Sequence, residues 1–132
     1  MHRFILLLIT YLITLFSAWG SNVHYSFTQL SLEEGLSQAN VQSILLDSRG
    51  DLWIGTKNGL NLYAQQKMTN YFHTLEDRYS IPNNHILHLA EDSLGNIWIS
   101  TPQGLASYNR ERNAFDTFTR ARVQSSLCIE GG

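Results

Sequence analysis

The amino-acid sequence predicts an all-β protein, and three observations lead to this fold class. The stretch "DSRGDLWIGTKNGLNLY", residues 47–63, recurs 45 positions later as "DSLGNIWISTPQGLASY", residues 92–108. Each copy divides into short apolar or aromatic segments separated by glycine-containing turns, a pattern typical of strands. A repeat period of about 20–50 residues indicates a solenoid, a propeller or an array. Because four antiparallel strands per period form a propeller blade, we predict an incomplete β-propeller of two four-stranded antiparallel blades plus an N-terminal extra strand.

The first 20 residues have the composition of a secretory signal peptide. A positive start, Met1 to Arg3, precedes the uncharged segment "FILLLITYLITLF", and Ala18 and Gly20 are small residues of the kind a signal peptidase reads. The uncharged segment is shorter than the roughly 20 residues that span a bilayer, although an uncleaved anchor is the alternative. We therefore predict a signal peptide over residues 1–20 and an exported, periplasmic chain.

The repeat also sets the expected division of the rest of the chain. Residues 21–34 should hold the extra strand and a lead-in, residues 35–79 blade 1, and residues 80–120 blade 2, with an out-of-pattern tail at 121–132. The strands expected within the blades are 41–46, 51–56, 60–63, 68–72, 85–90, 96–101, 105–108 and 115–118.

Residues that recur in both copies suit scaffold roles. Aspartate and glycine make tight turns, tryptophan fills the wedge between one blade and the next, threonine bonds across a strand pair, and tyrosine buries its ring. We assign this structural motif to Asp47, Gly50, Trp53, Thr56, Gly59 and Tyr63, and to Asp92, Gly95, Trp98, Thr101, Gly104 and Tyr108.

Candidate ligand-binding residues lie where the chain enters the innermost strand of each blade. The segments "GLSQAN" and "SIPNNH" contain amides and an imidazole, which donate and accept hydrogen bonds as sugar hydroxyls require. The alternative is that these polar residues only cap and turn their loops. The candidates are Gln38, Asn40, Asn83, Asn84 and His85.

Other chemistry has little support. Nine Lys plus Arg against eleven Asp plus Glu give no basic excess, so we expect no nucleic-acid partner. Because "HILH" belongs to the expected strand 85–90, His85 and His88 should point to opposite faces, so we expect no metal site and no cofactor. Glu91 and Asp92 diverge as neighbours, and we expect no enzymatic activity in the chain itself. The single cysteine, Cys128, excludes an internal disulfide.

The residues "VQSILLDSRGDLWIGTKNGLNLY" and "ILHLAEDSLGNIWISTPQGLASY" resemble the two-component regulator propeller repeat, and "FTQLSLEEGLSQANV" resembles its usual lead-in. Ser100 departs from the pattern, where the first copy has glycine. The resemblance implies the periplasmic sensor region of a bacterial hybrid histidine kinase or diguanylate cyclase anchored in the inner membrane, with a small-molecule or carbohydrate ligand. Further blades, downstream sensor domains and the output domain would then be its partners.

Propellers close with about 4–8 blades, so we interpret the chain as an N-terminal fragment of a longer sensor. Two blades alone leave apolar faces in water, and we expect marginal stability and self-association through the open blade edges. Two alternative functions remain open at this stage. One is a lectin-like or polysaccharide-processing propeller, and the other is an inactive truncated product.

Overall fold

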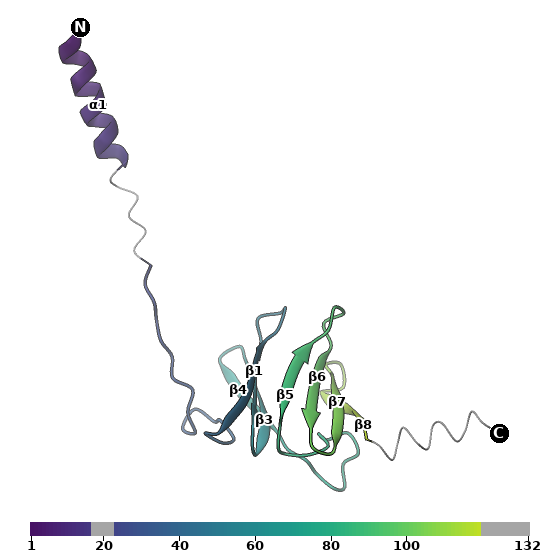
Figure 1. The fold of residues 1–132 in the computed structure, drawn as a ribbon. Helices are drawn as coiled ribbons and strands as arrows, with labels where there is room; N and C mark the ends of the chain where they lie inside the picture. Colours follow the sequence, from purple (N-terminus) through teal and green to yellow (C-terminus); the bar gives the residue numbers. More distant parts are fainter. Residues whose placement is uncertain (17–22, 120–132) are drawn as a thin grey trace.

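The computed structural model describes residues 1–16 and 23–119 of the chain. The single helix in these ranges, α1 (His2–Phe16), is set apart from the two sheets (Figure 1). Eight strands follow it in the described part of the chain: β1 (Val41–Leu46), β2 (Leu52–Thr56), β3 (Gly59–Ala64), β4 (Lys67–Tyr71), β5 (His88–Glu91), β6 (Ile97–Thr101), β7 (Gly104–Asn109) and β8 (Ala114–Phe118).

The strands form two four-stranded antiparallel sheets, ordered β1-β2-β3-β4 and β5-β6-β7-β8. Within each sheet, strands that follow one another in the sequence are paired, as in propeller blades, and the predicted fold class is confirmed. β1 coincides with the predicted strand, but β5 begins at His88 instead of residue 85. The reason is that the Ile86 amide donates to the Thr56 carbonyl of blade 1 at 2.9 Å, so that Ile86 bonds to blade 1 and not to β6.

The N-terminal extra strand is not observed, since residues 23–40 contain no strand. A lone extended segment stays in a strand only if a neighbouring strand pairs with its backbone groups. Residues 23–30 follow no edge of either sheet, and the rings of Tyr25 and Phe27 are 76% and 95% exposed. This part of the prediction is therefore corrected: in the described chain the lead-in precedes two blades without a further strand.

The core lies between the two blades. We call the surface of each sheet that carries its tryptophan the front face, and the opposite surface the back face. Trp53 and Leu60 on the front face of blade 1 pack in one cluster with Ile97, Ile99 and Phe115 on the back face of blade 2. All five residues are at most 2% exposed. The blades thus meet front to back, which leaves the back of blade 1 and the front of blade 2 without a neighbouring blade in the described residues.

Two sequence expectations concern residues outside the described ranges. The predicted cleavage region lies in residues 17–22, and Cys128 lies in residues 120–132. Among the residues that the structure describes, no helix has the length and apolar character needed to cross a membrane.

Candidate functional site

Each blade has two ends that carry different kinds of residue. The turns that follow Asp47 and Asp92 connect the first and second strands, and we call this end of the blades the Asp end. The opposite end carries residues 35–40 and 80–87, which lead into the first strands, and the short turns between the second and third strands. We call it the lead-in end.

At the Asp end, Asp47 organises its own turn. Its Oδ1 accepts hydrogen bonds from the backbone N–H groups of Arg49 and Asp51, both at 3.0 Å, and its Oδ2 accepts one from the indole of Trp53 at 2.9 Å. Gly50 has φ of +87°, a conformation that glycine adopts without steric cost. The carboxylate therefore connects the turn to the tryptophan of the following strand.

The second copy repeats this geometry. Asp92 Oδ1 accepts from the amides of Leu94 and Asn96, and Oδ2 accepts from the indole of Trp98, each at 2.9 Å. Gly95 has φ of +81°. Since the same atoms bond in both blades, the repeated aspartate, glycine and tryptophan form one local unit.

These bonds also fix the ionisation of both aspartates. Burial acts to raise the pKa of Asp47, but hydrogen bonds from Trp53 and from Arg110 outweigh it, and the pKa is lowered. Hydrogen bonds from Trp98 and Asn96 lower the pKa of Asp92 to about 2. Both groups are ionised at neutral pH and already accept several protein hydrogen bonds, so neither is poised as a general acid.

The turns at the lead-in end also repeat. Thr56 Oγ1 donates to the Gly59 carbonyl and Thr101 Oγ1 donates to the Gly104 carbonyl, each at 2.9 Å. The two glycines have φ of +126° and +146°, values that favour glycine. Each threonine thus closes the turn between the second and third strands of its blade.

The two repeated tyrosines differ in their surroundings. Tyr108 is buried between the blades, and its hydroxyl donates to Asn113 Oδ1 at 2.7 Å. Tyr71 of blade 1 donates to the same oxygen at 2.7 Å, and its burial, with the adjacent Tyr108 hydroxyl, raises its pKa. Tyr63 is only half-buried, because it lies on the back face of blade 1.

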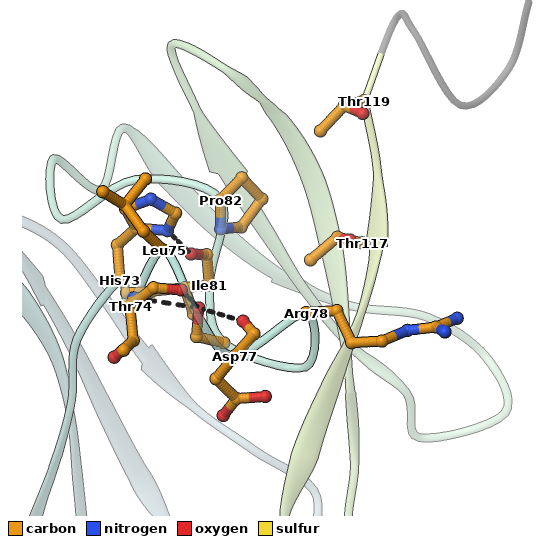
Figure 2. Close-up of a pocket in the computed structure, with 10 residues that line it drawn as sticks. His73, Thr74, Leu75, Asp77, Arg78, Ile81, Pro82, Thr117 and Thr119 are labelled. Carbon is orange, nitrogen blue, oxygen red and sulfur yellow. Dashed lines mark hydrogen bonds between the residues drawn. The ribbon is translucent and has the colours of Figure 1, made fainter.

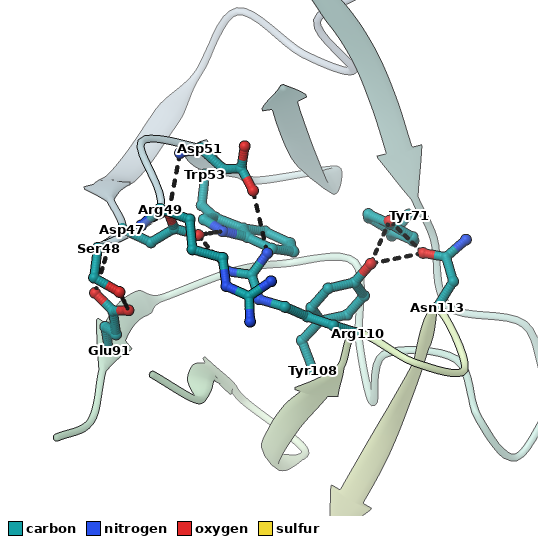
Figure 3. Close-up of polar contacts among 10 residues, drawn as sticks. All are labelled: Asp47, Ser48, Arg49, Asp51, Trp53, Tyr71, Glu91, Tyr108, Arg110 and Asn113. Atoms are coloured by element: carbon teal, nitrogen blue, oxygen red, sulfur yellow. Dashed lines mark hydrogen bonds and ion pairs between the residues drawn. The ribbon is translucent and has the colours of Figure 1, made fainter. Parts of the chain in front are cut away.

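Polar contacts link the blades at the Asp end (Figure 3). Glu91 accepts from the backbone N–H of Ser48 at 2.8 Å and from its hydroxyl at 2.5 Å. Arg110 donates to Asp47 at 2.5 Å and to Asp51 at 3.1 Å. These contacts hold the two sheets in register beside the apolar core.

The repeat pattern does not predict this interblade cluster. Its residues are not repeated: Glu91 corresponds to Leu46, and Arg110 to Gln65, when the copies are aligned. The available signal was therefore the departure from the repeat, since a residue needed at only one interface has no reason to recur.

At the lead-in end, the turn of residues 57–58 lies between the entry segments of both blades. The Lys57 amide donates to the Asn40 carbonyl at 3.2 Å, and the Gly59 amide donates to the Asn84 carbonyl at 2.7 Å. Lys57 and Asn58 are exposed at the tip of the turn. The structure therefore brings the two predicted entry segments to one end of the blades, on either side of a shared turn.

Three of the five candidate ligand residues use their side chains within these loops. Asn83 Oδ1 accepts from the His85 amide at 2.7 Å, and Asn84 Oδ1 accepts from the His73 amide at 2.6 Å. Asn40 Oδ1 accepts from Gln42 Nε2 at 2.6 Å. These oxygens shape the loops, in line with the alternative role of capping and turning.

Gln38 and His85 differ from the other three candidates. Gln38 Oε1 and His85 Nε2 are buried atoms without a hydrogen-bond partner in the described part of the chain. Buried polar atoms are usually hydrogen-bonded to protein or to ordered water. Among the five candidates, the Gln38 amide oxygen and the His85 imidazole nitrogen are thus the groups that could still form a hydrogen bond.

A separate cavity of about 200 Å³ lies between the connection of residues 73–82 and β8 (Figure 2). Its polar lining is largely engaged: His73 Nδ1 lies 2.7 Å from the Ile81 carbonyl, and Ser80 Oγ donates to the carbonyls of Thr74 and Asp77 at 3.0 and 2.8 Å. Most of these lining groups therefore hold the connection in shape.

Metal-binding chemistry has no geometric basis in the described ranges. No group of three or more His, Cys, Asp or Glu side chains there is arranged to hold a metal ion. The argument from strand alternation at "HILH" is corrected, because His85 precedes the strand that starts at His88.

Comparison with known proteins then decides the nature of the repeat. A family model described as "Two component regulator propeller" matches residues 35–58 and 80–103, each of which covers the lead-in, the first strand, the Asp turn and the tryptophan strand of one blade. The two copies are two-component regulator propeller repeats. The hydrogen-bonded unit of aspartate, glycine and tryptophan is thus the structural centre of this repeat in both blades.

The proteins to which the chain is similar are much longer than the chain itself. The chain is 38% identical over 79 residues to Histidine kinase P4 of Formosa agariphila, an alignment that covers 59% of this chain and 6% of the kinase. It is also similar to the extracellular domain of BT3049 from B. thetaiotaomicron, which is assigned as a hybrid two component system. That match has 33% identity and a TM-score of 0.62, and it covers 69% of this chain and 13% of the other. A second extracellular domain, of BT4673 from the same organism, shares the fold at 24% identity with a TM-score of 0.53 and covers 60% of this chain and 11% of that one.

Proposed function

We propose that this chain supplies two blades of the extracytoplasmic propeller by which a bacterial two-component-type receptor senses a ligand. The observation that carries the proposal is the similarity of both blades to the extracellular domain of BT3049 at 33% identity. The chain spans only 13% of that domain and 6% of the related kinase. We therefore propose that the remaining blades and a kinase or cyclase output are supplied by other parts of the receptor. The blades themselves serve as binding scaffold and not as catalyst.

Within this proposal the ligand binds at the lead-in end, and its class is a neutral carbohydrate or a similar polyhydroxylated small molecule. Gln38 Oε1 and His85 Nε2 support the placement, because they are buried and lack protein partners in the described residues. Exposed Lys57 and Asn58 lie on the turn between them and add donors. Sugar hydroxyls both donate and accept hydrogen bonds, so they match a mixture of amide, imidazole and ammonium groups.

A binding titration tests the site. The full chain is titrated with a panel of neutral oligosaccharides by isothermal calorimetry, alongside His85→Ala, Gln38→Ala and a control, Arg49→Ala, at the exposed Asp end. We expect at least one oligosaccharide to bind, with affinity reduced about tenfold by each lead-in variant, a loss of about 1.4 kcal/mol, and unchanged by the control. Binding that all three variants share equally, or no binding by any panel member, would refute this site.

Export is tested separately with an alkaline phosphatase fusion after residue 119. Alkaline phosphatase is active only where its disulfides form, outside the cytoplasm. The proposal predicts an active fusion and loss of activity when residues 2–16 are deleted. An inactive fusion that retains residues 2–16 would contradict extracytoplasmic function without bearing on the oligosaccharide result.

A further inference from the structure

The turn of residues 57–58 at the lead-in end places Asn58 directly before Gly59. Asparagine is a thermolabile residue, and a following glycine favours its breakdown, because the glycine amide nitrogen reaches the asparagine side chain without hindrance from a Cβ. Asn58 is the one asparagine of the sequence that glycine follows, and its side chain is exposed to water. The turn therefore carries the components of a spontaneous chemical modification.

The fold requires glycine at position 59. Gly59 has φ of +126°, and a Cβ there would lie 2.8 Å from Cε1 of Phe72 and 2.9 Å from Oγ of Ser37. Its counterpart in blade 2, Gly104, has φ of +146°, and a Cβ there would lie 2.5 Å from the carbonyl oxygen of Phe118. Glycine is thus required in both turns, and the residue before it decides whether the turn is labile.

That preceding residue differs between the blades. Blade 2 has Gln103 where blade 1 has Asn58. Attack by the next amide nitrogen on a glutamine side chain closes a six-membered ring, whereas attack on asparagine closes a five-membered ring, which forms faster. The same turn is therefore chemically stable in blade 2 and labile in blade 1.

Hydrogen bonds hold the labile turn in the folded chain. The amide of Asn58 donates to Thr56 Oγ1 at 3.1 Å. The amide of Gly59, which contains the attacking nitrogen, donates to the Asn84 carbonyl in the entry segment of blade 2 at 2.7 Å. A reaction within the chain requires the two reacting atoms to approach in the correct geometry. Because the Gly59 amide is directed toward blade 2, this approach requires the bond between the blades to open.

We propose that Asn58 is a site of spontaneous deamidation and that the hydrogen bond from Gly59 to blade 2 controls its rate. The Gly59 nitrogen forms a bond to Cγ of Asn58, the bond between Cγ and Nδ2 breaks, and the amide proton leaves with Nδ2 as ammonia. Water then opens the resulting succinimide at one of its two carbonyl carbons, which gives aspartate or isoaspartate. Neither a ligand nor a further blade takes part in this reaction.

Isoaspartate alters the turn more than aspartate does. It routes the backbone through the former side chain, which adds one atom to the chain between residue 58 and Gly59. The turn pairs Thr56 with Gly59, and the register of a hairpin depends on the length of its turn. The added atom therefore displaces the Gly59 amide from the Asn84 carbonyl and loosens the contact between the blades at the lead-in end.

The experiment follows deamidation by peptide mass spectrometry of the purified full chain, incubated in parallel in native buffer and in urea. In urea we expect Asn58 to react faster than Asn96, which precedes Ile97 and serves as the internal reference. In native buffer we expect the rate at Asn58 to be at least about tenfold lower than in urea, because the turn must first open. Near-ultraviolet circular dichroism monitors the fold of the native sample.

The matched variant is Gln103→Asn, which places asparagine before glycine in blade 2. Within the described residues, the amide of Gly104 donates no hydrogen bond to another blade. We therefore expect the introduced asparagine to react faster than Asn58 in native buffer and at a similar rate in urea. The control, Asn58→Gln, copies the blade 2 turn and should remove the mass change at residue 58.

Three results would overturn the proposal. The first is a rate at Asn58 in urea no higher than the rate at Asn96. The second is an equal rate at Asn58 in native buffer and in urea. The third is a rate at residue 103 of Gln103→Asn that is no higher in native buffer than the rate at Asn58. Because each readout is a covalent change in mass, the outcome is independent of oligosaccharide binding.

Discussion

Trp53 and Trp98 occupy the same position in two blades, yet their surroundings differ. Each indole donates to the carboxylate of its own Asp turn at 2.9 Å. Trp53 is completely buried and packs edge-on against Tyr108 of blade 2, with ring centroids 4.8 Å apart. Trp98 is only half-buried, and its ring lies against Phe118 of its own blade, with ring centroids 5.7 Å apart. The repeat motif therefore sets the local geometry, whereas burial depends on the presence of a neighbouring blade.

Gly55 and Ser100 lead to the same conclusion from the backbone side. Gly55 lies on the front face of blade 1, where Ile86 of blade 2 leaves no room for a Cβ. Ser100 occupies the equivalent position on the front of blade 2, where no described residue imposes that limit. The close approach of blade 2 thus requires glycine at residue 55, whereas no described residue requires it at residue 100.

The largest expected effect comes from removing the two indoles. Trp53→Ala should lower the free energy of unfolding by about 3–5 kcal/mol, because it leaves a cavity between the blades. Trp98→Ala should cost about 1–2 kcal/mol, since a half-exposed ring loses less burial. Urea unfolding monitored by circular dichroism measures both, and equal losses would show that the blades are not packed as described.

A smaller effect is expected at the glycine position. Gly55→Ala should destabilise the chain by about 1–3 kcal/mol, because the added methyl group overlaps Ile86. The matched change Ser100→Ala should stay within about 0.5 kcal/mol. If Gly55→Ala proved as mild as Ser100→Ala in the same urea titration, the close approach of the two blades at this point would be refuted.

Two ion pairs of the chain differ in place: Arg110 and Asp47 join the blades, whereas Arg112 and Asp116 lie within blade 2. Arg110→Gln should cost about 1–2 kcal/mol, because the side chain of Asp47 has no exposed surface and loses its cationic partner. Arg112→Gln breaks an exposed pair with Asp116 within blade 2 and should cost no more than about 0.5 kcal/mol. Thermal unfolding of the two variants gives the ranking, and the reverse order would argue that Arg110 does not join the blades.

The smallest expected effect is the dependence of stability on pH under acidic conditions. Asp47 and Asp92 have folded-state pKa values below the usual value near 3.8, so the folded chain binds fewer protons than the unfolded chain at low pH. Their stabilising contribution is complete above about pH 4 and is lost as the pH falls toward about 2, where Asp92 titrates. Asp92→Asn should therefore reduce the urea midpoint at pH 7 and flatten its decline between pH 4 and pH 2. An unchanged acid slope would contradict the assigned hydrogen bonds.

The sequence predicted the blades well, because strand boundaries and turns depend on local residues that recur. β1 matches the expected segment, and the Asp turns and positive-φ glycines lie where the pattern placed them. The prediction of an extra strand was wrong because such a strand must pair with the edge of a sheet that is distant in sequence. No local pattern in residues 23–34 encodes that pairing.

The candidate site was predicted less completely. Repetition drew attention to residues 35–40 and 80–85, and both segments lie at one end of the blades, but only geometry separates Gln38 and His85 from the loop-shaping asparagines. The interblade contacts of Glu91 and Arg110 could not be derived, because they depend on how one sheet sits against the next.

The most direct test of the account is acrylamide quenching of tryptophan fluorescence in variants that retain only Trp53 or only Trp98, the other tryptophans being replaced by phenylalanine. We predict that Trp53 is protected from acrylamide and that Trp98 is readily quenched. Equal quenching of the two indoles would contradict the claim that blade 1 is covered by blade 2 while the front of blade 2 is open.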